Sequence, residues 1–248
     1  MRIIISPAKK MRVEQELLSW KEHPTFLAFA EELKVYLSSL SYEELKQMWK
    51  CNDAIATVNY ERIRGMELQS NLTPAILAYE GIQYQYMAPQ VMTEDELSYI
   101  QETLRILSGF YGLLRPLDGV VPYRLEMQSK LSKFRTKDLY QFWNQELYSL
   151  LTKETNQILN LASKEYSKCI EKYLEESIQL VTCIFGEWVN GKVKEKGTYA
   201  KMARGEMVRF LASVGAQSVD EAKAFTGLGF QYSEELSTET EYVFLREV

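Results

Sequence analysis

Ionisable side chains stand inside segment 107–127, LSGFYGLLRPLDGVVPYRLEM, which is otherwise apolar and repeatedly broken by glycine and proline. This segment is too interrupted for a helix and too apolar for an ordinary surface loop, so we expect it to hold one fixed shape. Asp118, Tyr123 and Glu126 carry groups that can act as general acid or base. They are candidate catalytic residues.

Arg115 and Arg124 alternate with Asp118 and Glu126 in the same segment. Two interpretations are open. The guanidinium groups bind an anion such as a phosphate, or they form internal ion pairs that lock the loop without any ligand.

A second candidate site is SPAKK (6–10), which follows the short β-branched run RIIIS. The carboxyl end of a buried strand in an α/β sheet is where ligands tend to bind. Ser6 and Lys9 are therefore candidates for phosphate contact, and Lys9 is also a candidate nucleophile if its amine is sheltered and neutral. A solvated lysine beyond a strand is the alternative.

NLAS (160–163) repeats the order of apolar strand, small polar turn and helix start. Backbone N–H groups at such a helix start can hold an anion, so Asn160 and Ser163 join the candidates. The simpler alternative is that Ser163 only caps the helix.

A further candidate element is segment 191–211, GKVKEKGTYAKMARGEMVRFL, whose second half has a helical apolar stripe. Its cationic candidates for phosphate binding are Lys192, Lys201, Arg204 and Arg209. A solvated basic helix face is the alternative. Gly205 is unfavourable inside a helix by about 1 kcal/mol relative to alanine, which predicts a close approach to the backbone there.

Basic residues are concentrated in two stretches of a chain whose net charge is -5. Segment 186–210 has six Lys or Arg against three Glu, and segment 105–137 has seven Lys or Arg against two acidic residues. Segregated charge of this kind suits a phosphate-bearing partner in a cleft, whereas a pI near 5.3 disfavours binding of polyanions over the whole surface.

The small number of histidines and the wide spacing of the cysteines limit the kinds of catalytic and metal site that the chain can form. His23 is the one histidine, so a Ser-His-Asp triad or a histidine-rich metal site lacks its residues. Cys51, Cys169 and Cys183 are widely spaced, which suits a reducing compartment. We expect no bound metal and no cofactor, and direct iron sequestration is disfavoured.

The 248 residues are 46% hydrophobic and 25% charged, as in globular proteins. The N-terminus lacks the pattern of a secretion signal, and no apolar run is long enough to span a membrane. We expect a cytoplasmic protein.

Periodicity predicts alternating strands and helices without repeats or a flexible linker. We expect one compact mixed α/β domain over residues 1–248, with an early helical lobe at roughly 25–66. Strands are predicted at 2–6, 75–79, 82–87, 105–108, 157–163, 180–188 and 242–248. Helices are predicted at 25–40, from 41 with a Ser41–Glu44 capping box, and at 53–66, 93–104, 137–153 and 199–214.

Seven motifs in order give the chain a strong resemblance to the YaaA family of peroxide-stress proteins. They are SPAK (6–9), AILAYEGIQY (75–84), segment 107–127, DLYQFW (138–143), NLASKEY (160–166), GKVK (191–194) and AKMARGEMVRF (200–210). The resemblance covers nearly the whole chain.

The resemblance implies a cytoplasmic protein that helps bacteria survive hydrogen peroxide and limits iron-driven damage. It also implies a single α/β domain with a helix-hairpin-helix element and a positively charged cleft that binds duplex or distorted DNA. The matching positions, expected around that cleft, are Lys9, Arg115, Tyr123, Arg124, Asn160, Ser163, Lys192, Lys201 and Arg204. The motifs do not locate the helix-hairpin-helix.

Two functions remain open at this point. The first is a DNA-binding stress protein without a metal of its own, in which tyrosines stack on exposed bases. The second is an enzyme acting on nucleotides or damaged nucleobases, with Lys9 as nucleophile and the carboxylates of segment 107–127 as acid or base.

Overall fold

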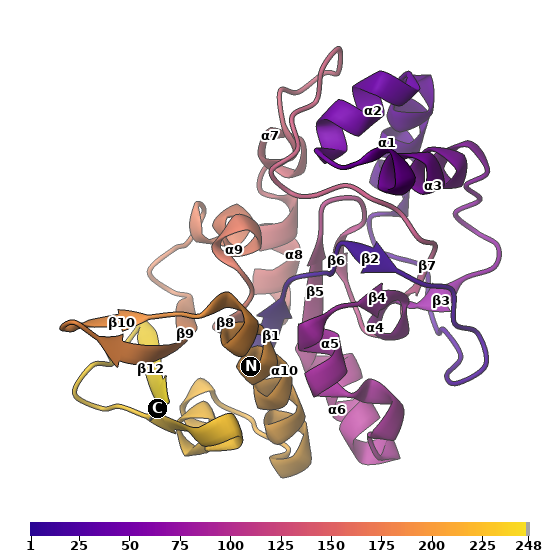
Figure 1. Cartoon of the computed structure of the whole chain (residues 1–248). Coiled ribbons are helices and arrows are strands. Elements are labelled where there is room, and N and C mark those ends of the chain that lie inside the picture. Colours follow the sequence, from indigo (N-terminus) through magenta and orange to yellow (C-terminus); the bar gives the residue numbers. More distant parts are fainter. Residues whose placement is uncertain (247–248) are drawn as a thin grey trace.

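The first strand, β1 (Arg2–Ile5), lies at the centre of the main sheet. Its Ile3, Ile4 and Ile5 are completely buried, as expected for a strand covered on both faces. The computed structural model describes residues 1–246. These form a single compact domain of mixed α/β class, which confirms the predicted fold class (Figure 1).

The main sheet has the strand order β11-β12-β9-β8-β1-β5-β6, with β10 paired to β9. Neighbours from β12 to β5 pair in parallel, whereas β6, β10 and β11 pair antiparallel. The other strands are β5 (Leu104–Ser108), β6 (Gly112–Leu114), β8 (Gln157–Leu161), β9 (Gln179–Val189), β10 (Lys192–Lys194), β11 (Phe230–Tyr232) and β12 (Glu241–Arg246). The last two residues of the strand predicted at 242–248 lie outside the described part.

The chain leaves β1 toward β5 on one side and later returns to β8 on the other side. The carboxyl ends of β1 and β8 therefore flank a topological switch point, where α/β sheets usually bind ligands.

The main helices are α1 (Leu27–Ser39), α2 (Tyr42–Trp49), α3 (Asp53–Arg64), α5 (Ile82–Met87), α6 (Glu94–Thr103), α7 (Leu139–Trp143), α8 (Glu146–Glu154), α9 (Lys164–Glu171) and α10 (Gly197–Val214). Figure 1 shows α1, α2 and α3 together at one end of the molecule. Short elements complete the fold: β2 (Lys10–Met11) with β4 (Tyr79–Glu80), β3 (Thr73–Pro74) with β7 (Gly119–Val120), α4 (Ala75–Ala78) and the 3₁₀ turns Pro89–Val91, Val219–Ala224 and Gly227–Gly229.

Local signals confirm several predicted boundaries. Ser41 and Glu44 form the predicted capping box of α2, and Thr93 and Glu96 form one at the start of α6. These contacts depend only on residues three apart, which explains why the sequence alone locates them.

The strands predicted at 75–79 and 82–87 are wrong. Residues 75–78 form the helical turn α4, only Tyr79–Glu80 is strand, and 82–87 is the helix α5. The alternation in IQYQYM resembles a strand, but the buried residues Gln83, Tyr84 and Met87 follow helical spacing because α5 packs against α10.

The single helix predicted at 137–153 is also wrong. It is divided into α7 and α8 at Asn144, whose φ of 43° departs from helical geometry.

Gly205 is the contact point of α10 with α5. A Cβ there would meet the carbonyl oxygen of Gln83 and lie 2.9 Å from Met87 N. The backbone that approaches Gly205 is therefore that of α5.

Segment 107–127 is packed onto itself and onto α7. A Cβ on Gly109 would lie 2.5 Å from the carbonyl oxygen of Leu125, and Trp143 Nε1 donates a 3.0 Å hydrogen bond to Gly109 O. Gly112 has a φ of +78° and lies against the Trp143 ring. Gly109 and Gly112 thus allow segment 107–127 to fold back on itself, so that its last residues reach the cavity described next.

Candidate functional site

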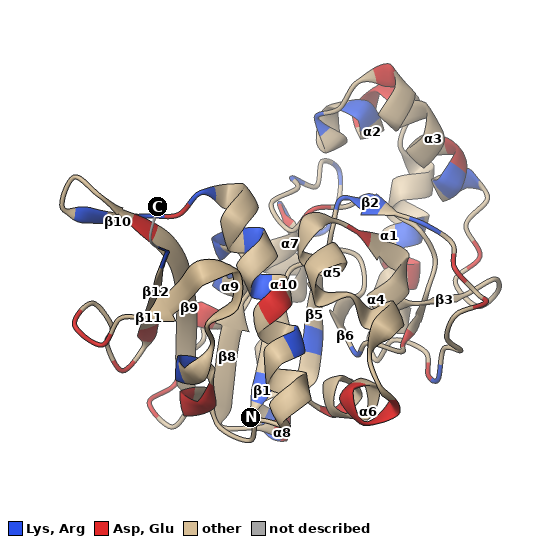
Figure 2. Ribbon diagram, turned by 60° about the horizontal axis from the view of Figure 1, so that its bottom comes forward, with Lys and Arg blue, Asp and Glu red and all other residues tan. Residues whose placement is uncertain are grey.

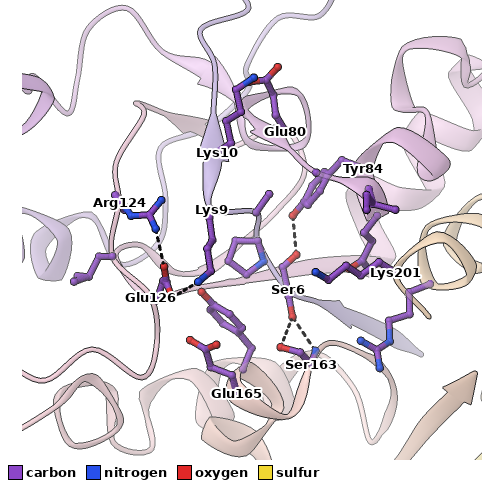
Figure 3. A pocket seen from close by; sticks show the side chains of 18 of the residues that line it. Ser6, Lys9, Lys10, Glu80, Tyr84, Arg124, Glu126, Ser163, Glu165 and Lys201 are labelled. Carbon is purple, nitrogen blue, oxygen red and sulfur yellow. Dashed lines mark hydrogen bonds and ion pairs between the residues drawn. The ribbon is translucent and has the colours of Figure 1, made fainter. Parts of the chain in front are cut away.

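A cavity of about 550 Å³ lies beside the carboxyl ends of β1 and β8. Four of the predicted cationic residues, Lys9, Arg124, Lys201 and Arg204, come from three separate segments and line it together (Figure 3). Because they meet in one hollow, they can contact the same ligand.

Ser6 and Ser163 form the floor that joins the two strand ends. Ser6 Oγ accepts a hydrogen bond from Ser163 N at 2.8 Å and donates to Ser163 Oγ at 3.2 Å, while the Tyr84 hydroxyl donates to Ser6 O at 3.0 Å (Figure 3). Ala162 N donates to Asn160 Oδ1 at 2.9 Å. These two N–H groups of NLAS are engaged within the protein.

Glu126 joins two of the cationic residues. Its carboxylate lies 2.8 Å from Lys9 Nζ and 3.3 Å from Arg124 Nη2. The Lys9 side chain is 65% exposed, whereas those of Arg124 and Glu126 are mostly buried. The internal ion pair that the sequence left open between Arg124 and Glu126 is therefore present.

The remaining cations differ in their pairing. Lys10 pairs with Glu80 at 3.0 Å, and Arg204 pairs with Glu195 at 3.1 Å. Lys201, by contrast, has no carboxylate within ion-pair distance among residues 1–246. It is the cavity cation whose charge is least compensated.

Three buried N–H groups in residues of the cavity wall have no hydrogen-bond partner within residues 1–246: Gln83 Nε2, Arg124 Nε and Arg204 Nε. Gln83 is 8% exposed. Buried donors are normally paired, and leaving one unpaired costs about 1–3 kcal/mol. Each of these nitrogens is itself enclosed by protein atoms, so contact with a ligand would come through the other polar atoms of these side chains.

Glu165 adds a second carboxylate next to Glu126. Burial raises the pKa of Glu165, the hydrogen bond from Gln128 N at 3.2 Å opposes this shift, and the charge of Glu126 raises the pKa further. The cavity therefore contains two carboxylates in ion pairs, Glu80 and Glu126, and a third, Glu165, that holds its proton more readily.

Tyr123 reaches the cavity wall but is an interior residue. Its hydroxyl bonds to Ser108 Oγ at 2.6 Å and to the Tyr79 hydroxyl at 2.8 Å. Burial raises its pKa to about 12. These contacts give the hydroxyl a structural role in the core.

A second cavity, of about 380 Å³, adjoins the first and shares Lys9 and Glu126 with it. Trp49, Lys50 and Lys130 line it from α2 and from the loop after segment 107–127. Trp49 Nε1 is another buried donor without a partner. We call the two cavities together the double groove.

The other predicted site residues do not line the double groove. Asn160 is buried and bonds to Thr182 Oγ1 as well as to Ala162 N. Lys192 is exposed on β10, and Arg209 is exposed further along α10. None of these three meets the cations of the first cavity.

Arg115 and Asp118 lie elsewhere. Arg115 is within 3.8 Å of Glu154 and 3.7 Å of Glu22. Asp118 is buried and accepts a 2.9 Å hydrogen bond from Arg115 N. The same Glu154 binds Arg105 at 2.6 Å, so the basic residues of 105–137 are divided between ion pairs in different places.

Several residues of the first cavity were not among the sequence candidates. They are Lys10, Glu80, Gln83, Tyr84, Glu165 and Tyr166. All except Lys10 belong to the motifs AILAYEGIQY and NLASKEY, and Lys10 follows SPAK directly. Their place in or next to these motifs is the sequence feature that could have identified them as cavity residues.

Residues 1–246 contain no group of three or more His, Cys, Asp or Glu side chains placed to hold a metal ion. Within the same residues, no helix has the length and apolar character needed to cross a membrane.

Comparisons with known proteins identify the family and several relatives of this chain. The family model described as peroxide stress protein YaaA matches residues 1–236. A UPF0246 protein of Lachnoclostridium phytofermentans is 60% identical over 246 residues, covering 99% of this chain and 96% of that protein. UPF0246 proteins of Desulfitobacterium hafniense and Pediococcus pentosaceus are 54% and 50% identical, each covering 99% of this chain and 98% of the relative. The chain therefore belongs to the YaaA family of peroxide stress proteins.

Proposed function

We propose that this protein binds DNA in the cytoplasm through the double groove and thereby limits iron-driven damage during hydrogen peroxide stress. The supporting observation is that cationic side chains from separate segments line two adjoining cavities, with Lys9, Lys10, Arg124, Lys201 and Arg204 in the first and Lys9, Lys50 and Lys130 in the second. A DNA backbone offers closely spaced phosphate oxygens, which are strong acceptors for such side chains.

The charge distribution supports a polyanion in this place. Lys201 on α10 and Lys50, directly after α2, line different cavities of the groove, while the chain as a whole has a net charge of -5. An acidic remainder discourages loose binding elsewhere, so nucleic acid is directed to the groove. Figure 2 shows basic and acidic segments interspersed over the ribbon, which suits a local site better than a wholly basic face.

We assign the helix-hairpin-helix element to α2 and α3. The two helices contact each other and are joined by Lys50, Cys51 and Asn52. Lys50 has a left-handed φ of 47°, and Asn52 caps α3 by accepting from Ile55 N at 3.0 Å. This hairpin borders the second cavity, where it is placed to contact a duplex that continues beyond the first.

The test is binding of a fluorescent duplex followed by anisotropy at about 50 and 200 mM salt. If the protein makes several phosphate contacts, affinity falls steeply over this range. Lys201→Ala is expected to weaken binding and to reduce the salt slope by about one.

A matched control is Lys153→Ala. Lys153 is an exposed lysine next to Glu154, which pairs with Arg2 at the amino end of β1. This change is expected to leave the affinity as in the wild type. DNA binding that is absent, or that does not change with salt, would overturn the proposal. In cells, Lys201→Ala is expected to lower survival in peroxide relative to Lys153→Ala.

A second candidate function is an enzyme acting on nucleotides or damaged nucleobases, and the two neighbouring carboxylates Glu126 and Glu165 favour it. The Lys9 ammonium is paired with Glu126, whereas a nucleophilic amine must be neutral. Borohydride trapping of a Lys9 adduct on damaged DNA tests this role. Full activity of Lys9→Ala would remove it.

A further inference from the structure

We infer that the first cavity holds one nucleotide unit, with the phosphate at the α10 cations and the base against the tyrosine wall. This inference rests on the proposed nucleic-acid function and adds what the inner cavity recognises.

The size of the first cavity suits a small molecule. Its volume of about 550 Å³ is within the roughly 300–1,000 Å³ of pockets that enclose compact ligands. A groove that only followed a backbone would not need this volume. The volume therefore provides space for a base as well as its phosphate.

One side of the cavity is built for a phosphate. Lys201 and Arg204 stand one turn apart on α10, and Arg204 has both a carboxylate partner at Nη2 and an unpaired, buried Nε. An oxyanion can accept from the guanidinium of Arg204 and pair with the ammonium of Lys201 at the same time.

The other side is built for a flat ring with carbonyl or ring-nitrogen acceptors. Tyr84, Tyr123 and Tyr166 contribute buried aromatic walls, and Gln83 contributes a side-chain amide. Aromatic side chains and bases attract each other through their faces. An amide can bond to acceptors on a base edge. Both features are satisfied by a nucleobase and not by a phosphate alone.

The second cavity explains how such a unit remains part of a strand. It continues from the first through Lys9 and Glu126 and carries Lys50 and Lys130. A strand whose one nucleotide occupies the first cavity can place its neighbouring phosphates there.

The test measures binding of deoxyadenosine monophosphate, deoxyadenosine and inorganic phosphate by calorimetry. The nucleotide is expected to bind at least about tenfold more tightly than either part alone, since only it engages both sides. Equal affinity for phosphate and nucleotide, or no nucleotide binding, would overturn the inference.

Two glutamine variants on α5 sharpen this test. Gln83→Met keeps the side-chain length and removes the amide, so nucleotide affinity is expected to fall about fivefold. Gln85→Met makes the same change at an exposed position on the same helix and is expected to have no effect. If Gln83→Met is as stable as the wild type and binds the nucleotide equally well, Gln83 does not read the base.

A wild-type measurement avoids dependence on variants. A 2-aminopurine is placed as a single-nucleotide bulge in a duplex. Its fluorescence emission is expected to change when the base packs against Tyr84, Tyr123 and Tyr166. Duplex binding without mononucleotide binding or an emission change would overturn this inference and leave the proposed DNA binding intact. Loss of all binding would overturn both.

Discussion

The ammonium group of Lys9 lies 2.8 Å from Glu126 Oε2 in the wall common to both cavities. The same carboxylate also binds Arg124 at 3.3 Å. Before a ligand phosphate can pair fully with these two cations, it must compete with Glu126. The carboxylate thus occupies a position in which a phosphate would be stabilised.

Glu126→Gln is accordingly expected to tighten DNA binding, and Lys9→Ala to weaken it. Each effect should be about two- to fivefold, corresponding to ~0.5–1 kcal/mol, because the Lys9 ammonium is solvent-exposed and its pairing is screened by water. Anisotropy titrations at low salt measure both. If both substitutions weaken binding equally, the intact Lys9–Glu126 ion pair is needed for binding, and Glu126 does not compete with the phosphate.

Gly205→Ala is expected to destabilise the protein. The added Cβ would meet Gln83 O and Met87 N, which are backbone atoms of α5 and cannot rotate away. Overpacking of this kind costs about 1–3 kcal/mol in the free energy of unfolding, and denaturant titration measures it.

Gly197→Ala provides the control for Gly205. Nothing lies within 4 Å of a Cβ at Gly197, in the first turn of the same helix. That change should leave the stability unchanged or raise it by less than about 1 kcal/mol. Equal stability of the two variants would show that α5 and α10 are less closely packed than the structure indicates.

Asp118→Asn is expected to alter the pH dependence of stability. Burial raises the pKa of Asp118 from 3.8 to about 7, although the hydrogen bond from Arg115 N opposes the shift. The folded protein therefore keeps this proton in a range where the unfolded chain has lost it. Its contribution to stability is complete below 3.8 and is lost as pH rises through about 7.

The measurement is the free energy of unfolding across that pH range for the wild type and the variant. The wild type should lose stability with rising pH relative to Asp118→Asn. Asp95→Asn, which changes an exposed carboxylate, should follow the wild type. Parallel curves for wild type and Asp118→Asn would contradict the raised pKa.

Part of this site follows from local sequence rules. Ser6 and Ser163 each stand just after an apolar run that forms a parallel strand, and parallel strands bring their carboxyl ends to one edge. Their proximity was therefore predictable. The capping boxes at Ser41 and Thr93 were predictable for the same reason, since they need only residues three apart.

The other features of the fold and the site depend on tertiary contacts. Whether Arg115 would meet a ligand or Glu154 depends on packing between residues far apart in the chain, which no spacing rule encodes. The alternation of 82–87 indicates a strand until Gly205 brings α10 against it. The convergence of Arg124 with Lys201 likewise depends on how segment 107–127 folds back, so the basic stretches alone could not reveal the cavity.

Tyr123→Phe separates a structural from a catalytic role of that hydroxyl. The hydroxyl links Ser108 and Tyr79 in the core, and the ring stacks on Phe110 with centroids 5.0 Å apart. Removing only the oxygen should lower the free energy of unfolding by about 1–2 kcal/mol, because buried partners lose a hydrogen bond. DNA affinity should stay as in the wild type, whereas a loss of binding or activity at unchanged stability would show that the hydroxyl acts on the ligand.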